Sequence, residues 1–231
     1  MPKTLCIIQA RMGSTRLPGK VLKCLNGKPV LWHVYNRVRK AKKVDKIIVA
    51  TTNLSVDNSI AEFCIDNQID YYRGDEQDVL SRYYESAKKY NGEIIIRITS
   101  DCPLIEPKII DLMLEKYQDT WAYYSNCHPN RVVPIGLDVE ITNFKFLELA
   151  FKESKDKSER EHVMPYFYRN PDKFKLASLE DQGLDSSMRI TLDTEDDYKL
   201  IQDIYSEFKN FDYFSIEQIT PIYNRIKGII F

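Results

Sequence analysis

Cysteine pairs are missing from this sequence. Five cysteines occur in 231 residues, and no two of them form a C-x-x-C pair. Cys6 and Cys64 lie inside apolar runs. An odd number of cysteines without such pairs indicates reduced thiols rather than a disulfide framework or a thiolate metal site. We therefore expect a cytoplasmic protein.

Long apolar stretches and a charge imbalance are also missing. No stretch approaches the roughly 20 apolar residues that cross a bilayer. We expect no secretory leader in the first residues, because polar Gln9 and Arg11 follow only a short apolar run. The formal net charge is −1, so no overall charge attracts the chain to nucleic acid or to an anionic membrane. We expect neither as a partner, and any phosphate site must come from a local group of cations.

Repeats, low-complexity tracts and clear linkers are absent as well. Hydrophobic residues make up 43% and charged residues 29% of the chain, which is typical of a globular protein. A chain of this length fits one large α/β domain. We predict a single domain over residues 1–231, with residues 120–142 as a sub-lobe or dimerisation arm.

What the sequence does contain is an alternation of short apolar runs and helical patterns. Residues 5–8, 47–49 and 94–96 predict buried strands, and apolar positions between residues 30 and 41 recur at helical spacing. This alternation favours a three-layer α/β/α fold with a mostly parallel central sheet, whose ligands bind at the carboxyl ends of the strands. Further helices are predicted near residues 56–67, 78–90, 108–117, 144–152, 159–168, 195–208 and 216–226, and further strands near 71–72, 121–124, 137–141, 174–179 and 188–192.

The loop after the first predicted strand carries the strongest chemical signal. Residues 9–20 read Gln-Ala-Arg-Met-Gly-Ser-Thr-Arg-Leu-Pro-Gly-Lys. Glycines let backbone N–H groups approach phosphate oxygens, while Arg11, Arg16 and Lys20 supply charge for a triphosphate. One cation about 4 Å from a phosphate oxygen contributes roughly 4 kcal/mol at an effective dielectric constant near 20. The loop therefore predicts a triphosphate site, and a solvated basic loop is the alternative.

Two better-known phosphate loops do not fit. A Walker A loop has the spacing G-x4-G-K-[ST], whereas five residues separate Gly13 from Gly19 and Val21 follows Lys20. The dinucleotide pattern G-x-G-x-x-G is absent. These differences argue against a P-loop ATPase and against a typical dehydrogenase.

Two aspartates follow later predicted strands. Asp101 lies in the Thr-Ser-Asp-Cys-Pro sequence of residues 99–103, and Asp193 lies in the Thr-Leu-Asp-Thr-Glu-Asp-Asp sequence of residues 191–197. Carboxylates at the ends of such strands face the ligand edge of the sheet, and Mg²⁺ binds through one or two carboxylates plus substrate phosphates. We predict that Asp101 and Asp193 hold Mg²⁺. A turn or helix cap is the alternative role of Asp101.

The second half of the chain supplies candidates for the acceptor site. Asp138 and Glu140 are two residues apart, so they share one strand face. Their predicted role is to contact acceptor hydroxyls or to help hold the metal, and a solvent-facing polar edge is the alternative. Arg160 and His162 fall within one helical turn and suit an anionic acceptor. His33, between apolar neighbours, is expected to be a packed residue.

Two capping boxes are predicted from their spacing. Thr194 with Asp197, and Ser158 with Glu161, each place a hydroxyl residue three positions before an acidic residue. This pattern starts a helix. We therefore expect Asp197 and Glu161 to have structural roles.

These motifs resemble the cytidylyltransferases that activate 3-deoxy-manno-octulosonate and sialic acid. The resemblance rests on the 9–20 loop, the Ser-Asp-Cys-Pro turn at 100–103 and the Leu-Asp-Thr-Glu-Asp-Asp segment at 192–197. It is greatest to their relatives, the SpsF-type polysaccharide biosynthesis proteins, which three further segments resemble: residues 73–83, 134–140 and 160–166. The likeness covers about residues 4–200.

The resemblance implies a GT-A-like nucleotidyltransferase fold, a homodimer, and Mg²⁺ held by Asp101 and Asp193. It also implies that Arg73 lies near the cytosine. Arg11, Lys20 and Asp101 are then the predicted catalytic residues. The implied nucleotide pocket consists of Ala10, Arg11, Gly13, Ser14, Arg16, Lys20, Arg73, Asp78, Ser81 and Arg82.

The implied reaction is transfer of CMP from CTP to a sugar acid, or to a sugar or polyol phosphate, with release of pyrophosphate. Such a step serves the synthesis of cell-surface polysaccharide or glycan. One alternative is a glycosyltransferase that uses a nucleotide sugar, although Asp101-Cys-Pro103 lacks the second carboxylate of an Asp-x-Asp metal motif. Another triphosphate in place of CTP, and a non-catalytic nucleotide or sugar sensor, are the remaining alternatives.

Overall fold

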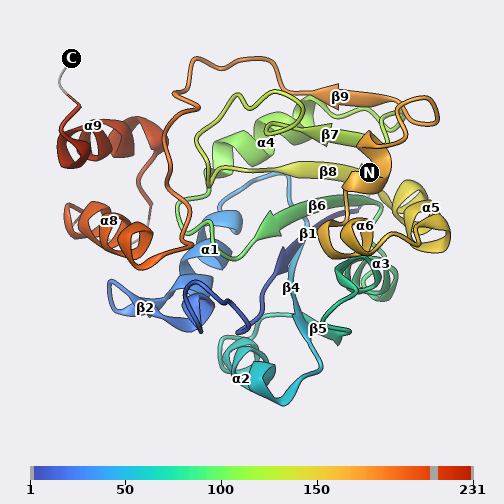
Figure 1. The fold of residues 1–231 in the computed structure, drawn as a ribbon, viewed down its shortest axis with the longest axis horizontal. Coiled ribbons are helices and arrows are strands. Elements are labelled where there is room, and N and C mark those ends of the chain that lie inside the picture. Colours follow the sequence, from blue (N-terminus) through green and yellow to red (C-terminus); the bar gives the residue numbers. More distant parts are fainter. Residues whose placement is uncertain (1–2, 209–212, 230–231) are drawn as a thin grey trace.

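A seven-stranded sheet forms the centre of the part of the chain that the computed structural model describes, residues 3–208 and 213–229. The strand order is β5-β4-β1-β6-β8-β7-β9 (Figure 1). The strands are β1 (Thr4–Gln9), β4 (Lys46–Thr52), β5 (Tyr71–Gly74), β6 (Ile94–Thr99), β7 (Tyr123–Ser125), β8 (Glu140–Asn143) and β9 (Leu176–Ser178).

Most strand pairs in this sheet are parallel. β1 lies between β4 and β6 and is parallel to both, and β5 is parallel to β4. β8 is antiparallel to its neighbours β6 and β7, and β9 is parallel to β7. The carboxyl ends of β1 and β6 therefore meet at one edge, where Gln9 pairs with Thr99. The predicted mostly parallel sheet is confirmed.

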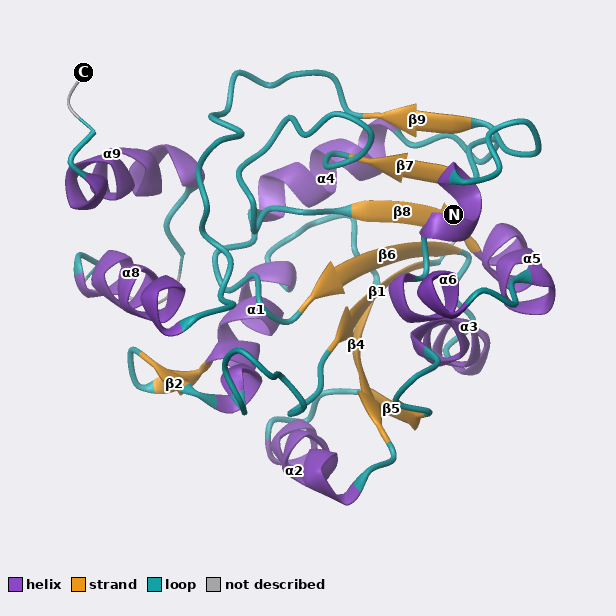
Figure 2. Cartoon of the chain, in the orientation of Figure 1, coloured by secondary structure: helices purple, strands orange, loops and turns teal. Residues whose placement is uncertain are grey.

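Helices cover both faces of the sheet and give three layers (Figure 2). Two separate clusters of buried apolar side chains lie on the two faces of the sheet. One cluster contains residues of α1, α2, α4, α8 and α9, and the other contains residues of α3, α5 and α7. The helices are α1 (Val30–Val38), α2 (Asn58–Asp66), α3 (Val79–Lys89), α4 (Pro107–Lys116), α5 (Phe144–Glu153), α6 (Lys157–His162), α7 (Pro165–Tyr168), α8 (Glu195–Ser206) and α9 (Ile216–Lys227).

Several short elements lie outside the sequence predictions. The 3₁₀-helix η1 (Lys20–Leu22) follows the loop after β1, and a small hairpin joins β2 (Cys24–Leu25) to β3 (Lys28–Pro29). A second 3₁₀-helix, η2 (Ser55–Asp57), forms the start of the helix predicted near residues 56–67. Asn26 and Gly27 both have positive φ at the hairpin turn, as a two-residue turn between twisted strands requires.

The predicted strand at residues 188–192 is wrong. This segment forms a single isolated bridge, between Ile135 and Arg189, instead of a strand of the main sheet. Its backbone pairs instead with two loops: Ile190 N–H donates to the carbonyl of Ile135, and Leu192 N–H donates to the carbonyl of Asp101, both at 2.8 Å. The apolar side chains are buried as predicted, but their backbone partners are loop residues.

The helix predicted over residues 159–168 is two helices. Val163 has a positive φ and ends α6, and Pro165 begins α7. A proline inside a continuous helix would lack an N–H donor and clash with the preceding turn. The capping box predicted for Ser158 and Glu161 is also wrong, because the cap of α6 is Asp156, which accepts from the N–H of Glu159.

The structure bears on three further predictions. All five cysteines are free thiols. His33 is buried, and one ring nitrogen lies 2.7 Å from the carbonyl of Leu25. The described helices include none with the length and apolar character needed to cross a membrane. Residues 120–142 contribute β7 and the loop that leads into β8, and their role in a dimer stays a prediction.

Candidate active site

A cavity of about 370 Å³ opens at the carboxyl ends of β1 and β6. It combines side chains from the loop after β1, from α3, from the loop after β6, from the end of α6 and from the segment before α8. Of the residues predicted for nucleotide, metal or acceptor, it is lined by Ala10, Arg11, Gly13, Ser14, Arg16, Lys20, Arg82, Asp101, His162 and Asp193. The other lining residues are Gln9, Thr15, Val21, Val79, Thr99, Ser100 and Glu161.

The 9–20 loop is anchored at Met12. The Met12 N–H donates to the carboxylate of Asp57 at 2.6 Å, and its carbonyl accepts from the N–H groups of Ser14 and Gly19 at 2.9 and 3.1 Å. Asp57 is 1% exposed and also accepts from the hydroxyl of Thr52. Gly19 has φ of 68° immediately before Lys20, a conformation that glycine adopts without steric cost. The loop is thus closed on itself and held to the end of β4.

Lys20 joins the two predicted metal ligands. Its Nζ donates to Asp101 Oδ2 at 2.9 Å, to Asp193 Oδ1 at 2.8 Å and to the carbonyl of Leu192 at 2.9 Å. Burial acts to lower the pKa of Lys20, but the charges of Asp101 and Asp193 outweigh it, so the pKa is raised. Burial likewise acts to raise the pKa of Asp193, and Lys20 outweighs it, so that pKa is lowered. Both groups are held in their charged forms.

The distant Asp193 reaches Asp101 because the segment before α8 binds the loop after β6. Besides the Leu192 N–H, the hydroxyl of Thr191 donates to the Asp101 carbonyl, at 3.1 Å. Gly136 lies against the same segment with φ of 111°, and a Cβ there would be 2.8 Å from the Ile190 carbonyl. Close backbone contact thus brings two aspartates 92 positions apart into one site.

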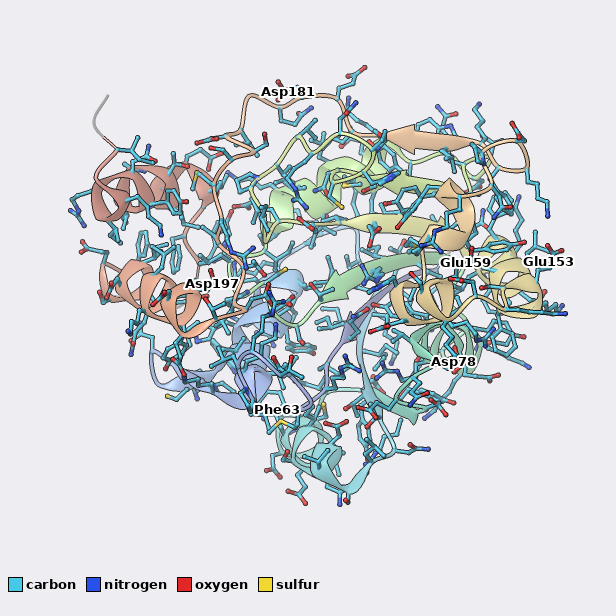
Figure 3. All side chains as sticks on the ribbon, viewed as in Figure 1. Phe63, Asp78, Glu153, Glu159, Asp181 and Asp197 are labelled. Atoms are coloured by element: carbon cyan, nitrogen blue, oxygen red, sulfur yellow. The ribbon has the colours of Figure 1, made fainter. Side chains whose placement is uncertain are left out.

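Arginines surround the outer side of Asp193. Arg16 and Arg189 lie 3.2 and 3.0 Å from its carboxylate. Arg189 also pairs with Asp197, which is labelled beside α8 in Figure 3. Asp197 completes a capping box with Thr194, so its predicted structural role is confirmed.

The donor set fits Mg²⁺. Asp101 and Asp193 direct one oxygen each to a single point, the Lys20 ammonium, within 2.9 Å. In the described ranges no group of three or more His, Cys, Asp or Glu side chains forms a metal cage. Two carboxylates without further protein ligands match Mg²⁺, which keeps waters and takes substrate phosphates as its remaining ligands.

Arg82 is an unpaired cation in the wall of the cavity. The residue is 2% exposed, and its Nε and Nη1 atoms are buried without a hydrogen-bond partner in the part of the chain that the structure describes. Burial lowers the pKa of Arg82, and nearby Arg11 lowers it further. Gly74 makes room for this side chain, since a Cβ there would be 2.7 Å from Arg82 Cγ. A buried guanidinium without partners is costly for the protein alone and suits a negatively charged ligand.

Sequence reasoning missed Glu161 as a lining residue. The assumed capping box placed it in the first turn of a helix, whereas it is in the last turn of α6, next to His162, and faces the cavity. The acidic N-cap Asp156 two residues before Ser158 was the available signal. The cavity thus gains a carboxylate and an imidazole from one helix end.

Six predicted residues do not line the cavity. Arg73 is on β5, where it donates to the carbonyls of Thr52 and Leu54. Asp78 caps α3 by accepting from the Ser81 N–H at 2.9 Å. Ser81 is the third, and its hydroxyl donates to the Asp78 carbonyl at 2.8 Å. The other three are Asp138, Glu140 and Arg160.

Those last three residues are bound in ion pairs. Arg160 pairs with Asp78 at 2.5 Å, a contact that ties α6 to the start of α3, where Figure 3 labels Asp78. Asp138 accepts two hydrogen bonds from Arg131, at 2.5 and 2.9 Å. Glu140 pairs with Arg97. Only Glu140 of the predicted Asp138–Glu140 strand pair is in β8, because β8 starts three residues later than the apolar pattern indicates.

Comparison with known proteins gives the family. A sequence profile described as Cytidylyltransferase matches residues 5–224. The spore coat polysaccharide biosynthesis protein SpsF of Bacillus subtilis is 30% identical over 97% of this chain and 95% of its own length. A 3-deoxy-manno-octulosonate cytidylyltransferase of Geobacter sulfurreducens is 37% identical over 46% of this chain and 41% of its own length.

Known structures agree with this assignment. The structure of a cytidylyltransferase from Leptospira borgpetersenii superposes with a TM-score of 0.92 at 34% identity, covering 100% of this chain and 97% of that one. The predicted fold and the predicted relationship to SpsF and to the octulosonate enzymes are therefore confirmed. The chain belongs to the cytidylyltransferase family of nucleotidyltransferases.

Proposed function

We propose that this enzyme transfers CMP from CTP to a sugar acid, or to a sugar or polyol phosphate, and releases pyrophosphate. The observation that carries the proposal is the cation set of one cavity. Lys20 sits between two carboxylates, and Arg82 is buried with unbonded N–H groups. Arg11 and Arg16 lie at the same cavity. Such a set matches the charge of a triphosphate chelated to a metal.

The residues act by position and charge. The oxygen of the acceptor attacks the α-phosphorus, the bond from that phosphorus to the β-phosphate oxygen breaks, and the electron pair leaves with pyrophosphate. Lys20, Arg11 and Arg82 stabilise the negative charge that grows on the phosphoryl oxygens. An anionic acceptor needs no base. For a neutral hydroxyl, Glu161 and His162 are the basic groups that the cavity wall offers.

We assign Mg²⁺ to Asp101 and Asp193. When bound, the ion would neutralise phosphate charge and hold the triphosphate in place. The two carboxylates converge as such a site requires.

Location and assembly complete the proposal. Free thiols at all five cysteines suit the cytoplasm, where CTP is available. The similarity to SpsF supports a step in the synthesis of a cell-surface polysaccharide. A homodimer follows from the family resemblance.

A pyrophosphate-release screen tests the proposed reaction. CTP, UTP, ATP and GTP are each combined with Mg²⁺ and with sugar acids, sugar phosphates, polyol phosphates and phosphonates. We expect release with CTP and one acceptor class. Pyrophosphate release with another triphosphate would identify that triphosphate, instead of CTP, as the donor substrate. Transfer of a sugar from a nucleotide sugar, with no release of pyrophosphate, would establish the glycosyltransferase alternative. Nucleotide binding without any turnover would indicate a sensor.

A further inference from the structure

One face of the sheet changes from apolar to polar beside the cavity. On β1, the buried side chains of Leu5 and Ile7 are followed on the same face by Gln9, and on β6 Ile95 is followed by Arg97 and then by Thr99. Alternate residues of a strand share a face. On the α3 side of the sheet, the side chains near the carboxyl ends of β1 and β6 are therefore polar, and they do not contribute to the apolar core.

A chain of hydrogen bonds connects these polar groups. The Oε1 atom of Gln9 accepts from Arg97 Nε at 3.1 Å and from the Tyr83 hydroxyl at 3.3 Å. Arg97 also pairs with Glu140, directly opposite on β8, and the second oxygen of Glu140 accepts from Tyr123 at 2.7 Å. Arg97 and Glu140 are only 15% and 10% exposed. The network is buried, and therefore rigid.

This network fixes the orientation of the Gln9 amide. Because Arg97 Nε can only donate, Oε1 is the end of the amide that faces it and the NH₂ group is the other end. The single hydroxyl hydrogen of Tyr83 is shared between Gln9 Oε1 and the Ile7 carbonyl, at 3.3 and 3.2 Å. Gln9 lines the cavity together with Asp101. The amide therefore presents donors at the border between the polar face and the proposed metal site. Gln9 is not among the residues predicted to bind the nucleotide, so this donor has no role in the proposed nucleotide site.

Asp138 and Arg131 extend the polar face outward. Asp138 is two residues before Glu140 in the segment that leads into β8, and its carboxylate accepts two hydrogen bonds from Arg131. Arg131 and Asp138 are 27% and 32% exposed.

Aromatic rings border the same area. The His128 and Tyr168 rings stack at 4.1 Å, and both lie about 6 Å from the ring of Tyr123, at 6.1 and 5.7 Å. Because Tyr123 donates to Glu140, its neighbour Tyr168 lies beside the network as well. We call Gln9, Arg97, Asp138, Arg131 and Tyr168 the polar floor.

The charges of the polar floor are paired. Arg97 is matched by Glu140, and Arg131 by Asp138, so the floor offers no spare cation to a further anion. A hydroxyl group both donates and accepts, and it can therefore donate to one member of each pair and accept from the other. The paired groups suit a hydroxyl-rich body better than a second charged group.

We propose that the polar floor is the acceptor subsite and that it recognises the hydroxyl groups of a sugar or polyol body, while the anionic group of the acceptor faces Asp101 and the loop cations. This inference rests on the proposed cytidylyl transfer. It assigns hydroxyl recognition to Gln9 and Asp138. Arg97, itself paired with Glu140, positions Gln9, and Arg131 positions Asp138.

Ligand binding tests the subsite separately from catalysis. Saturation-transfer NMR is measured on protein that holds a CTP analogue with a methylene bridge between the α- and β-phosphorus, which prevents transfer. Glycerol 3-phosphate and glucose 1-phosphate are compared with propyl phosphate, and gluconate is compared with butyrate. We expect the hydroxylated member of at least one pair to bind, and its hydroxyl-free partner to bind at least about tenfold more weakly.

Variants locate the binding. Asp138→Asn, at a partly exposed position, and Gln9→Met are each expected to weaken the binding of the hydroxylated probe by about 10- to 100-fold. Asp70→Asn, which removes an ion pair with Lys46 on the far edge of the sheet, serves as the matched control and leaves probe binding unchanged. Melting temperatures show that each variant is folded.

The outcomes separate this inference from the proposed function. Equal binding of hydroxylated and hydroxyl-free probes, no binding of any hydroxylated probe at millimolar concentration, or no effect of Asp138→Asn and Gln9→Met would each overturn the subsite. Hydroxyl-dependent binding without pyrophosphate release from CTP would leave the subsite in place and refute the transferase. Pyrophosphate release from CTP, with a KM for the acceptor that neither variant changes, would support the transferase and refute the subsite.

Discussion

Two buried arginines show how the same residue type serves different purposes. Arg97 is paired with Glu140, whereas Arg82 has unbonded N–H groups in the cavity wall. The protein alone gains nothing from the charge of Arg82, so we attribute its presence to the ligand.

Replacing Arg82 therefore separates binding from stability. Arg82→Met keeps most of the side-chain volume and is expected to weaken CTP binding by about 10- to 100-fold, the value of one or two charge-assisted hydrogen bonds. The free energy of unfolding should stay the same or increase, because an uncompensated buried charge is removed. Calorimetric titration with CTP and urea unfolding measure the two effects.

Arg97→Met is the matched control for this substitution. It leaves Glu140 buried without a partner and should destabilise the protein by about 3–5 kcal/mol. A destabilised Arg82→Met variant with unchanged CTP affinity would show that Arg82 is a structural residue.

Lys20 and Asp101 are expected to matter for turnover. Lys20→Ala and Asp101→Asn should each reduce kcat by about 10²- to 10³-fold, as loss of one preorganised charged group in a transition state commonly does. Lys23→Ala is the control, because Lys23 lies three residues away and pairs with Glu195 outside the cavity. Steady-state rates and circular dichroism on all three variants give the comparison. Near-normal turnover would remove the residue from the mechanism.

Sequence reasoning found the cavity residues that belong to local motifs, and it also assigned to the site residues that are bound to distant partners outside the cavity. Lys20 stands out because it lies in a glycine-containing loop, Asp101 because it closely follows β6, and Asp193 because it follows an apolar run that suggested a strand. Asp78 and Arg160, 82 positions apart, pair with each other. No spacing in the sequence reveals such a pair, so both were assigned to ligands.

At the level of elements, the segment before α8 decides whether the site forms. It is held by loop contacts to Ile135 and Asp101 instead of by a strand ladder. Its apolar residues suggested a strand because apolar periodicity reports burial and not the backbone partner.

Gly136→Ala tests this arrangement. The substitution places a methyl group 2.8 Å from the Ile190 backbone at a φ of 111°, and should cost about 1–3 kcal/mol of stability. Because the displaced segment carries Asp193, CTP affinity in Mg²⁺ should fall as well. Thermal unfolding and calorimetric titration measure the two quantities.

Gly183→Ala provides the comparison for backbone strain alone. Gly183 also has positive φ, but its Cβ would meet nothing within 4 Å. Equal CTP affinity in the two alanine variants would contradict the proposed role of Gly136.

Two further differences between prediction and structure had a signal in the sequence. Pro165 marks the break between α6 and α7, and Asn26-Gly27 is a typical hairpin turn. The hairpin was missed because each of its strands is only two residues long, whereas the break at Pro165 was outweighed by apolar spacing. A prediction based on helical periodicity alone continues a helix across such a proline.

For the whole molecule, the layered architecture was predictable because it depends on burial. The central strands β1, β4 and β6 are apolar on both faces, and only a sheet covered by helices on both sides buries such strands. The same reasoning does not predict the positions of the antiparallel β8 and the outer strands in the sheet. Short strands of mixed composition do not indicate which strands lie next to them.

The buried His33 is expected to make the stability of the whole molecule sensitive to acid. Burial lowers its pKa to about 4, whereas an exposed histidine titrates near 6.5. As pH falls below about 6.5 the unfolded chain binds a proton that the folded protein excludes, so stability is full above that pH and falls toward pH 4. The loss is on the order of 3 kcal/mol at most.

His33→Gln tests this contribution. The glutamine can still donate to the Leu25 carbonyl but does not titrate, so its free energy of unfolding should change less between about pH 7 and pH 4 than that of the native chain. Urea unfolding at several pH values gives the two slopes. Identical slopes would show that His33 is not the source of the acid sensitivity.

The central claim is that the 9–20 loop, Asp101 and Asp193 bind one metal–CTP chelate. Calorimetric titration of CTP with Mg²⁺ and with EDTA, on the native chain, Asp101→Asn and Asp193→Asn, measures this directly. We predict that Mg²⁺ strengthens CTP binding by the native chain and that either substitution removes this enhancement. CTP affinity that is the same with Mg²⁺ and with EDTA, or that keeps its dependence on Mg²⁺ in both variants, would contradict the account.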